Sequence, residues 1–171
     1  MICPIRKKLL ATDNLTGLQS RYAYTEMLNA YKNQDVFPEN LVAFVIDING
    51  LKTVNDTLGH EAGDEMIQGA AACIAQVLGK YGACFRTGGD EFVAILRMDK
   101  RQIAEAQQAL SDAAASWNGH TVEVLSFSTG YAIAAEYPGL SIEQIVHAAD
   151  QIMYANKAAY YRQAGKDRRK Q

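Results

Sequence analysis

The chain has 171 residues, which suits a single domain that buries a full core without disulfides or structural metals. Its 49% hydrophobic and 21% charged residues are typical of a globular protein, and its net charge of -2 gives no general reason to bind nucleic acid or a membrane surface. No apolar run approaches the roughly 18 residues of a membrane span, and the 3 cysteines have no metal-binding spacing, so a reduced, cytoplasmic protein is expected.

The two ends of the chain differ in composition from the rest. Residues 1–12 are expected to be a linker or the end of an upstream connecting helix, because this stretch is basic and then polar and contains Pro4. The same stretch lacks the long apolar segment of a signal peptide. Residues 13–171 are expected to form one domain, in which the basic run from Lys166 onwards is a solvated tail.

The first half of the domain predicts one strand among three helices. In chain order these elements cover Ser20–Lys32 (helix), Leu41–Ile46 (strand), Leu51–Leu58 (helix) and Glu61–Leu78 (helix). Ser20 is expected to cap the first helix, and Gly59 is expected to end the short one. The strand is a continuous apolar run, which is typical of a central position in a sheet, and it ends at Asp47.

The second half predicts a hairpin, a helix, a long strand and a closing helix. They cover Ala83–Thr87 with Glu91–Arg97 (hairpin), Lys100–Trp117 (helix), Thr121–Ala134 (strand) and Ser141–Tyr161 (helix, capped by Ser141). Gly88 and Gly89 join the hairpin strands, and adjacent glycines predict a primed turn with positive φ. The order β-α-α-β-β-α-β, framed by a helix at each end, predicts an α+β fold with a mixed, largely antiparallel central sheet.

Three carboxylates are expected to meet at one edge of this sheet. Asp47 closes the apolar strand, and Asp90 and Glu91 follow the glycine turn of the hairpin. If the two segments are neighbours, these oxygen ligands suit Mg²⁺ that carries substrate phosphates. The alternative for each acid alone is a solvated position at a strand end or turn. The Gly88-Gly89 turn admits a ligand close to the backbone and favours the functional interpretation of all three. Neither Asp47 nor Asp90 is expected to belong to the core.

The segment Arg86–Phe92 contains the signature of the GGDEF family, whose typical members are diguanylate cyclases. Four further segments resemble motifs of that family in the same order. They are Asp13–Leu18 with Arg21, Asp47–Lys52 with Asn55 and Asp56, Gly59–Asp64, and Ala149–Tyr154 with Lys157. The resemblance extends from Asp13 to about Arg169, so the domain is identified as a member of this family.

The resemblance implies a diguanylate cyclase, which condenses two GTP molecules into cyclic di-GMP and two pyrophosphates. Each 3′-hydroxyl must attack the α-phosphate of the other nucleotide, so two domains have to face each other as a homodimer. An upstream sensor domain, in some members anchored to a membrane, is implied as well. Two alternatives stay open: a silent regulatory domain that binds GTP or cyclic di-GMP, and a synthase of another cyclic dinucleotide such as cyclic GMP-AMP. The intact acids argue against the first alternative, and Asp64 argues against the second.

The resemblance also assigns the metal and the reacting groups. By resemblance, Asp47, Asp90 and the backbone carbonyl of Ile48 bind Mg²⁺ or Mn²⁺, with two ions in each active site. Asp90 or Glu91 would accept the proton of the attacking hydroxyl, and both remain candidates. Lys52 resembles the family's transition-state cation, whereas by itself it would be a solvated helix residue.

Guanine recognition is implied for Asn55 and Asp64, with His60 between them as a further contact. A carboxylate can accept two N–H groups of guanine, and a side-chain amide can both donate and accept. If the resemblance is set aside, Asn55 would be expected to cap a turn, and Asp64 would be expected to interact favourably with the positive end of a helix dipole. A histidine at a helix boundary is as readily structural as functional.

The sequence departs from the family pattern in three places. Asn49 replaces the commoner second acid of its motif, a variant that the family tolerates. Lys157 resembles the phosphate-contacting lysine, but the usual partner cation does not follow directly, so that Arg162 and Arg168 are both candidates. Product-inhibited members carry an R-x-x-D motif before the signature, and the matching positions Gly79–Gly82 have neither charge. An inhibitory site is therefore not expected.

Overall fold

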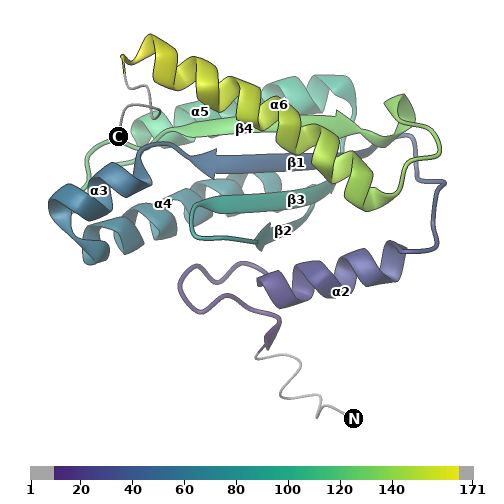
Figure 1. Ribbon diagram of the computed structural model, residues 1–171, viewed down its shortest axis with the longest axis horizontal. Coiled ribbons are helices and arrows are strands. Elements are labelled where there is room, and N and C mark those ends of the chain that lie inside the picture. Colours follow the sequence, from purple (N-terminus) through teal and green to yellow (C-terminus); the bar gives the residue numbers. More distant parts are fainter. Residues whose placement is uncertain (1–9, 166–171) are drawn as a thin grey trace.

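The computed structural model describes residues 10–165 and has the predicted α+β fold, a four-stranded sheet with helices on both faces (Figure 1). In chain order the elements are α2 (Arg21–Tyr31), β1 (Leu41–Ile48), α3 (Leu51–Leu58), α4 (His60–Leu78), β2 (Gly82–Arg86), β3 (Glu91–Arg97), α5 (Lys100–Ser116), β4 (Phe127–Ile133), the 3-10 turn η1 (Ala134–Glu136) and α6 (Ile142–Gln163). Within residues 10–165, none of the helices combines the length and the apolar character that a bilayer span requires.

Most predicted element boundaries agree with the structure to within one or two residues. The hydroxyls of Ser20 and Ser141 cap α2 and α6, because they accept hydrogen bonds from the N–H groups of Ala23 and Gln144, both 3.3 Å long. Gly59 separates α3 from α4 with a φ of 89°, a left-handed value that favours glycine. The capping and stop signals in the sequence are therefore confirmed.

The sheet has the strand order β2-β3-β1-β4, with β1 at a central position. Every pair of neighbouring strands among the described residues is antiparallel, so the expectation of a mixed sheet is wrong. Two helices carry the chain from β1 to β2, and these two strands run parallel, but β3 lies between them. One isolated parallel bridge joins Gln19 to Phe85 of β2.

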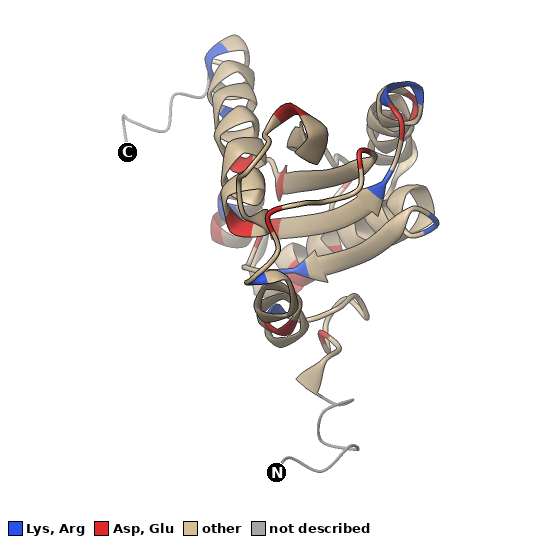
Figure 2. Cartoon of the chain, turned by 90° about the vertical axis from the view of Figure 1, so that its right-hand side faces the viewer, with Lys and Arg blue, Asp and Glu red and all other residues tan. Residues whose placement is uncertain are grey.

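The two faces of β1 pack against different helices, because side chains alternate along a strand. Val42, Phe44 and Ile46 lie in a core with α4 and α5, whereas Ala43 and Val45 lie in a core with α6. All 8 residues of β1 are buried, and burial of each large apolar side chain contributes about 1.5–3 kcal/mol. Figure 2 shows the consequence: the strands are tan along most of their length, and charged residues lie on helices, in loops and near strand ends.

Helix α6 crosses β4 and β1 at close range because a glycine lies under it (Figure 1). A Cβ atom at Gly130 of β4 would overlap the carbonyl oxygen of Ala149 and the amide nitrogen of Met153, which are backbone atoms of α6. Any larger residue would push the helix away from the sheet. Gly130 therefore sets the height of α6 above the strands.

The last strand is shorter than the sequence predicts. A strand is predicted over Thr121–Ala134, whereas β4 covers Phe127–Ile133. The first residue of β4 pairs with Ile48, and beyond that residue β1 turns away into α3, so the preceding segment has no strand to pair with. Its N–H groups bond to a helix instead: the carboxylate of Glu65 on α4 accepts from residues 121 and 122 at 2.9 and 3.2 Å.

The turn between β2 and β3 also differs from the predicted one. The sequence predicts a primed turn with positive φ, but neither Gly88 nor Gly89 has a positive φ. The loop contains four residues, Thr87–Asp90, and loops of this length are most often built around a type I turn, which needs no positive φ. A Cβ at Gly88 would lie 2.9 Å from Oε2 of Glu91, so a larger residue there would displace the carboxylate end of this exposed side chain.

Candidate functional site

Asp47, Asp90 and Glu91 lie at the same end of the sheet. Asp47 is directly opposite Glu91 in the register of β1 and β3, and the N–H of Ile48 donates to the carbonyl oxygen of Asp90 at 3.0 Å. Cross-strand partners place their side chains on the same face of a sheet, which is here the face covered by α6. The condition on which the expected meeting of the acids depended, that this strand and this hairpin are neighbours, is therefore met.

Lys157 of α6 brings a positive charge to this acidic end. Its ammonium forms an ion pair with Asp47 and lies 3.9 Å from Oδ2 of Asp90. The side chains of Asp47 and Lys157 are only 4% and 11% exposed. The expectation that Asp47 lies outside the core is therefore wrong, because the alternation of β1 directs this side chain under α6. The sequence does carry a signal for the buried lysine, since the buried face of α6 includes, at every fourth position, Ala149, Met153, Lys157 and Tyr161.

Burial changes the acid–base behaviour of Asp47. The pKa of Asp47 is raised to about 6, mainly because burial disfavours the charged carboxylate. The hydrogen bond from Lys157 offsets part of this rise, whereas the charges of Asp90 and Glu91 add to it. One ammonium thus faces several carboxylates, and this end of the sheet has a deficit of positive charge that a bound cation would relieve.

The donor set at this end fits a divalent metal that carries phosphates. Among residues 10–165, no three acidic, histidine or cysteine side chains are grouped so that they could hold a metal ion. Of the three carboxylates that were expected to meet, the structure brings two, Asp47 and Asp90, around the ammonium of Lys157. Mg²⁺ is usually held by one or two carboxylates together with water and substrate phosphates. This pair, with the backbone of Ile48 beside it, meets that requirement.

A second group of predicted residues lies on α3 and α4, which follow β1 at the same end of the sheet (Figure 1). The side-chain amide of Asn55 lies against the backbone of α4 at Gly63, the neighbour of Asp64. Asp64 is exposed, as are His60 at the start of α4 and Lys52 in the first turn of α3. The structure therefore places Asn55 beside the turn of α4 that carries Asp64, and leaves His60 and Lys52 open to solvent.

The cations expected at the substrate phosphates are on or beyond α6. Lys157 lies among the carboxylates, and its predicted contact with phosphate stays a prediction. Arg162 is exposed near the end of α6. Arg168 lies outside the residues that the structure describes. The choice between Arg162 and Arg168 therefore stays open.

The turn between β1 and α3 is held by side chains that sequence reasoning missed. The N–H of Gly50 donates to the hydroxyl of Tyr161 at 2.9 Å. Asn49 accepts from the hydroxyl of Ser128 at 2.7 Å and donates to the hydroxyl of Ser126 at 3.2 Å. Asn49, where the family more often has an acid, is thus a buried link between β1 and the β4 segment. The position of Tyr161 on the buried face of α6 is the signal that was available for it.

Arg86 holds the glycine turn of the family signature. Its guanidinium donates to the carbonyl oxygens of Gly88 and Gly89, both at 3.1 Å, and to Oδ1 of Asp13 at 3.2 Å. Burial by itself raises the pKa of Asp13, but the hydrogen bond from Thr16 and the charge of Arg86 outweigh burial, so that the pKa is lowered overall. Asp13 is therefore an ionised anchor of the arginine that supports the turn.

We expect Asp13→Asn to reduce stability at neutral pH and to lose this effect in acid. Because the pKa of Asp13 is lower in the folded state than its ordinary value of 3.8, the ionised group stabilises the fold above that value, and this contribution is lost as the pH falls through the folded-state pKa. Urea denaturation should show a loss of about 1–2 kcal/mol at pH 7 and a much smaller loss at about pH 2. Asp35→Asn, at an exposed loop position, is the control. An equal loss at both pH values would contradict the assignment.

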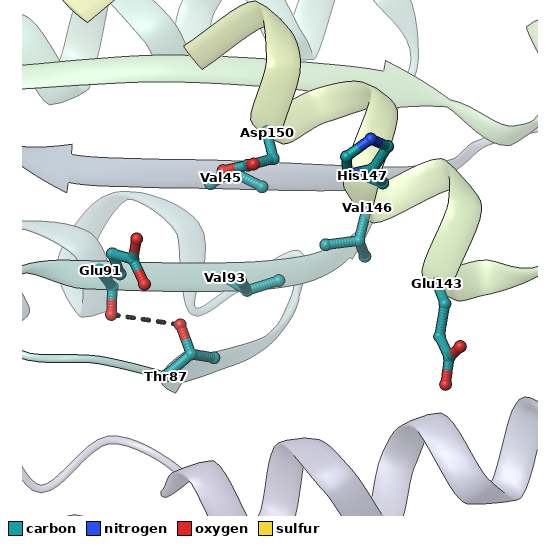
Figure 3. A pocket seen from close by; sticks show the side chains of 8 residues that line it. All are labelled: Val45, Thr87, Glu91, Val93, Glu143, Val146, His147 and Asp150. Carbon is teal, nitrogen blue, oxygen red and sulfur yellow. Dashed lines mark hydrogen bonds between the residues drawn. The ribbon is translucent and has the colours of Figure 1, made fainter. Parts of the chain in front are cut away.

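A cavity of about 210 Å³ lies between α6 and the strands β1 and β3, next to the signature turn (Figure 3). Its acidic lining residues are Glu91, Glu143 and Asp150, and valine side chains form its apolar part. Figure 3 shows Glu91 near Thr87, whose hydroxyl donates to the carbonyl oxygen of Glu91 at 3.5 Å. Glu91 thus faces this cavity, whereas Asp47 does not line it.

Comparison with known proteins identifies the family. The family model described as "Diguanylate cyclase, GGDEF domain" matches residues 10–163. The chain is 32% identical over 152 residues to the signaling protein YkoW of Bacillus subtilis, and 32% identical over 152 residues to the diguanylate cyclase DgcN of Escherichia coli. Each match covers 85% of this chain but only 19% of YkoW and 36% of DgcN. The chain therefore spans about a fifth to a third of these relatives.

A solved structure agrees with the sequence matches. The coiled coil and GGDEF domain of DgcB from Caulobacter crescentus, in complex with c-di-GMP, has a TM-score of 0.78 and 27% sequence identity to this chain. The likeness covers 91% of this chain and 84% of that one. Since the family model matches most of the chain and the fold agrees with that of a relative, the chain belongs to the GGDEF family of diguanylate cyclase domains.

Proposed function

We propose that this domain is a diguanylate cyclase, which joins two GTP molecules into cyclic di-GMP and releases two pyrophosphates. The observation that carries this proposal is the pair Asp47 and Asp90, held around one ammonium at the end of β1 and within an intact family signature. A domain that only binds a nucleotide has no need of both carboxylates. This pair therefore favours an enzyme over a silent regulatory domain.

The acidic end of the sheet is the proposed metal and reaction site. Asp47, Asp90 and the backbone carbonyl of Ile48 would hold Mg²⁺ or Mn²⁺, two ions in each site. When bound, the metal neutralises charge on the α-phosphate and on the leaving pyrophosphate. Asp90 is assigned to the metal because it lies with Asp47 near Lys157. Glu91, exposed at the start of β3, is assigned as the base that takes the proton from the 3′-hydroxyl.

Two lysines have separate proposed roles. Lys157 favours the ionised form of its buried partner Asp47 and balances the acidic pair, and its long side chain would contact a phosphate when GTP is bound. Lys52, exposed in the first turn of α3, would balance the charge that develops on the transferred phosphoryl group. Both roles depend on a compact positive charge close to phosphate oxygens.

Guanine is proposed to bind at the junction of α3 and α4. Asp64 would accept hydrogen bonds from the N1 and N2 groups of the base, and Asn55 would donate and accept one each. His60, at the start of α4, would be a further contact. Asn55 is on α3 and Asp64 is on the adjoining α4, so both side chains would contact the edge of the same base.

The active form is proposed to be a homodimer in which two nucleotides face each other. One copy holds one GTP, and each 3′-hydroxyl has to reach the α-phosphate on the other copy. Catalysis is then mostly a matter of positioning and charge stabilisation. An upstream sensor domain is proposed to control the activity by changing how the two copies meet.

The proposal is tested by incubating the protein with Mg²⁺ and GTP, ATP or both, and identifying the products by mass spectrometry. Because dimerisation limits the reaction, the domain is also fused to a parallel two-stranded coiled coil at its N-terminus and assayed in the same way. Cyclic di-GMP from GTP alone supports the proposal. GTP binding without product in the fused dimer points to the silent regulatory domain, and cyclic GMP-AMP from the mixture points to the other synthase.

Cyclic di-GMP is expected to inhibit the enzyme only weakly, by competition with GTP at the active site. The positions of the family's inhibitory motif are Gly79–Gly82, where Gly79 caps α4 and Gly82 begins β2, and neither required charge is present. Calorimetry with cyclic di-GMP should therefore show weak binding that Asp64→Ala removes. Tight binding that survives Asp64→Ala would show that a separate product site exists.

A further inference from the structure

A buried glycine in α4 has no backbone reason to be glycine. Gly63 lies in the first turns of the helix, and its N–H donates to the carbonyl oxygen of Gly59 at 3.3 Å, as in any helix. Its φ is not positive, so an L-residue fits the same backbone. Glycine is also the least favourable helix residue after proline. The reason for this glycine must therefore lie in what surrounds it.

The space that a side chain would need at position 63 is filled by Asn55. A Cβ atom at Gly63 would overlap Oδ1 of Asn55 and would lie 2.8 Å from its Cγ and 3.3 Å from its Nδ2. All three nearest atoms thus belong to one side-chain amide, which lies on the backbone of α4. Asn55 is only partly exposed, and it is the residue proposed to read guanine together with Asp64, the next residue after Gly63.

The backbone of Asn55 is held in α3, so a side chain at position 63 would have to displace the side chain of Asn55. Its carbonyl oxygen accepts the N–H of Gly59 at 3.0 Å and so closes the last turn of α3. A methyl group at position 63 would therefore act on the side chain rather than the backbone, and the amide would have to leave for another staggered rotamer. Such a change carries the amide away from the turn that bears Asp64.

We infer that Gly63 is a positioning residue for base selection, because the absence of its side chain fixes the amide of Asn55 beside Asp64. This inference rests on the proposed function, since it takes Asn55 and Asp64 as readers of guanine. Gly63 itself touches no substrate in this scheme and acts through Asn55. A displaced amide removes the contribution of Asn55 and leaves that of Asp64, so guanine preference should be weakened and not abolished.

The test compares Gly63→Ala with a matched substitution in the same helix. Gly69→Ala is the control, because Gly69 is also buried in α4 and its Cβ would be 2.6 Å from Cζ2 of Trp117, far along the helix from Asn55. Binding is measured by calorimetry with α,β-methylene GTP and its adenosine counterpart, which cannot release pyrophosphate. Gly63→Ala should weaken binding of the guanosine analogue about 10-fold or more and reduce the guanosine-to-adenosine ratio. Gly69→Ala should lower the melting temperature and keep that ratio.

A double-mutant cycle with Asn55→Ala separates this inference from the proposed function. Melting temperatures without nucleotide should show that Asn55→Ala recovers stability lost in Gly63→Ala, and the double variant should bind like Asn55→Ala alone. Additive effects on binding, or an unchanged nucleotide ratio in Gly63→Ala when Asn55→Ala changes it, would overturn the inference. If the two residues are coupled in stability but neither variant changes nucleotide binding, the contact between Gly63 and Asn55 is confirmed. The proposed guanine site would then be wrong, and so would the inference that rests on it.

Discussion

Asp90→Ala is expected to reduce cyclic di-GMP formation by about 10³-fold or more while the domain stays folded. The variant removes one of the two carboxylates at the proposed metal site. The side chain of Asp90 is 30% exposed and lies in a turn, so its loss opens no cavity in the core. Product formation is followed by chromatography with Mg²⁺ and GTP, and circular dichroism monitors the fold. Near-normal product formation would show that Asp90 is not a metal ligand.

Substitution of Asp47 has a second effect, because this carboxylate is the buried partner of Lys157. Asp47→Ala is expected to abolish product formation and also to lower the free energy of unfolding by about 3–5 kcal/mol, since it leaves a buried ammonium without its closest partner. The double variant Asp47→Ala with Lys157→Met removes both charges, and it should recover stability without recovering activity. Recovery of activity in the double variant would contradict a metal role for Asp47.

Asp64→Ser is expected to weaken the preference for GTP over ATP. Guanine offers N–H donors at N1 and N2 that a carboxylate accepts, whereas adenine offers a lone pair at N1, which the carboxylate repels. Sites built to hydrogen-bond a substrate reject analogues without the partner by about 10⁴-fold. Removal of the carboxylate should weaken GTP use and admit some ATP. The switch should be partial, because Asn55 still favours guanine.

The measurement for Asp64 is a competition assay with mixed GTP and ATP, read as the ratio of products. Glu61→Ser is the matched control, because Glu61 is an exposed acid in the first turn of the same helix. Both substitutions remove an exposed acid near the start of α4, and only Asp64→Ser should change the product ratio. If Asp64→Ser keeps the parental ratio, Asp64 is only a helix-start acid.

Local chemistry made much of this fold predictable. The boundaries of α3 and α4 follow from Gly59, which takes a positive φ between them, and from helical apolar spacing. The buried run of β1 and the acids after the hairpin turn indicated that Asp47 and Glu91 would lie near each other if the strand and the hairpin paired, and the strand register shows that they do. These features could be predicted because they depend mainly on residues that are close in the sequence, and on the pairing of one strand with the hairpin.

The turn at Gly88 and Gly89 is a local error, whereas the errors about β4 and Asp47 concern contacts between distant segments. The residues before β4 have high β-propensity, yet they lie beyond the end of β1, and a strand cannot continue without a partner. The ion pair of Asp47 with Lys157 was not predicted either, because the two residues are 110 positions apart in the sequence. Only the packing of α6 on the sheet brings the two together, and that packing depends on the close approach at Gly130.

The bridge between Gln19 and β2 has a consequence for solubility. β2 is an edge strand, and exposed edges invite pairing with strands of other molecules, which leads to aggregation. Gln19 occupies part of this edge, because its N–H donates to the carbonyl oxygen of Cys84 at 3.1 Å and its carbonyl oxygen accepts the N–H of Arg86 at 2.8 Å. The segment ahead of α2 thus acts as a cover for the sheet, and a shortened protein that begins after Gln19 would present two backbone groups ready to recruit a foreign strand.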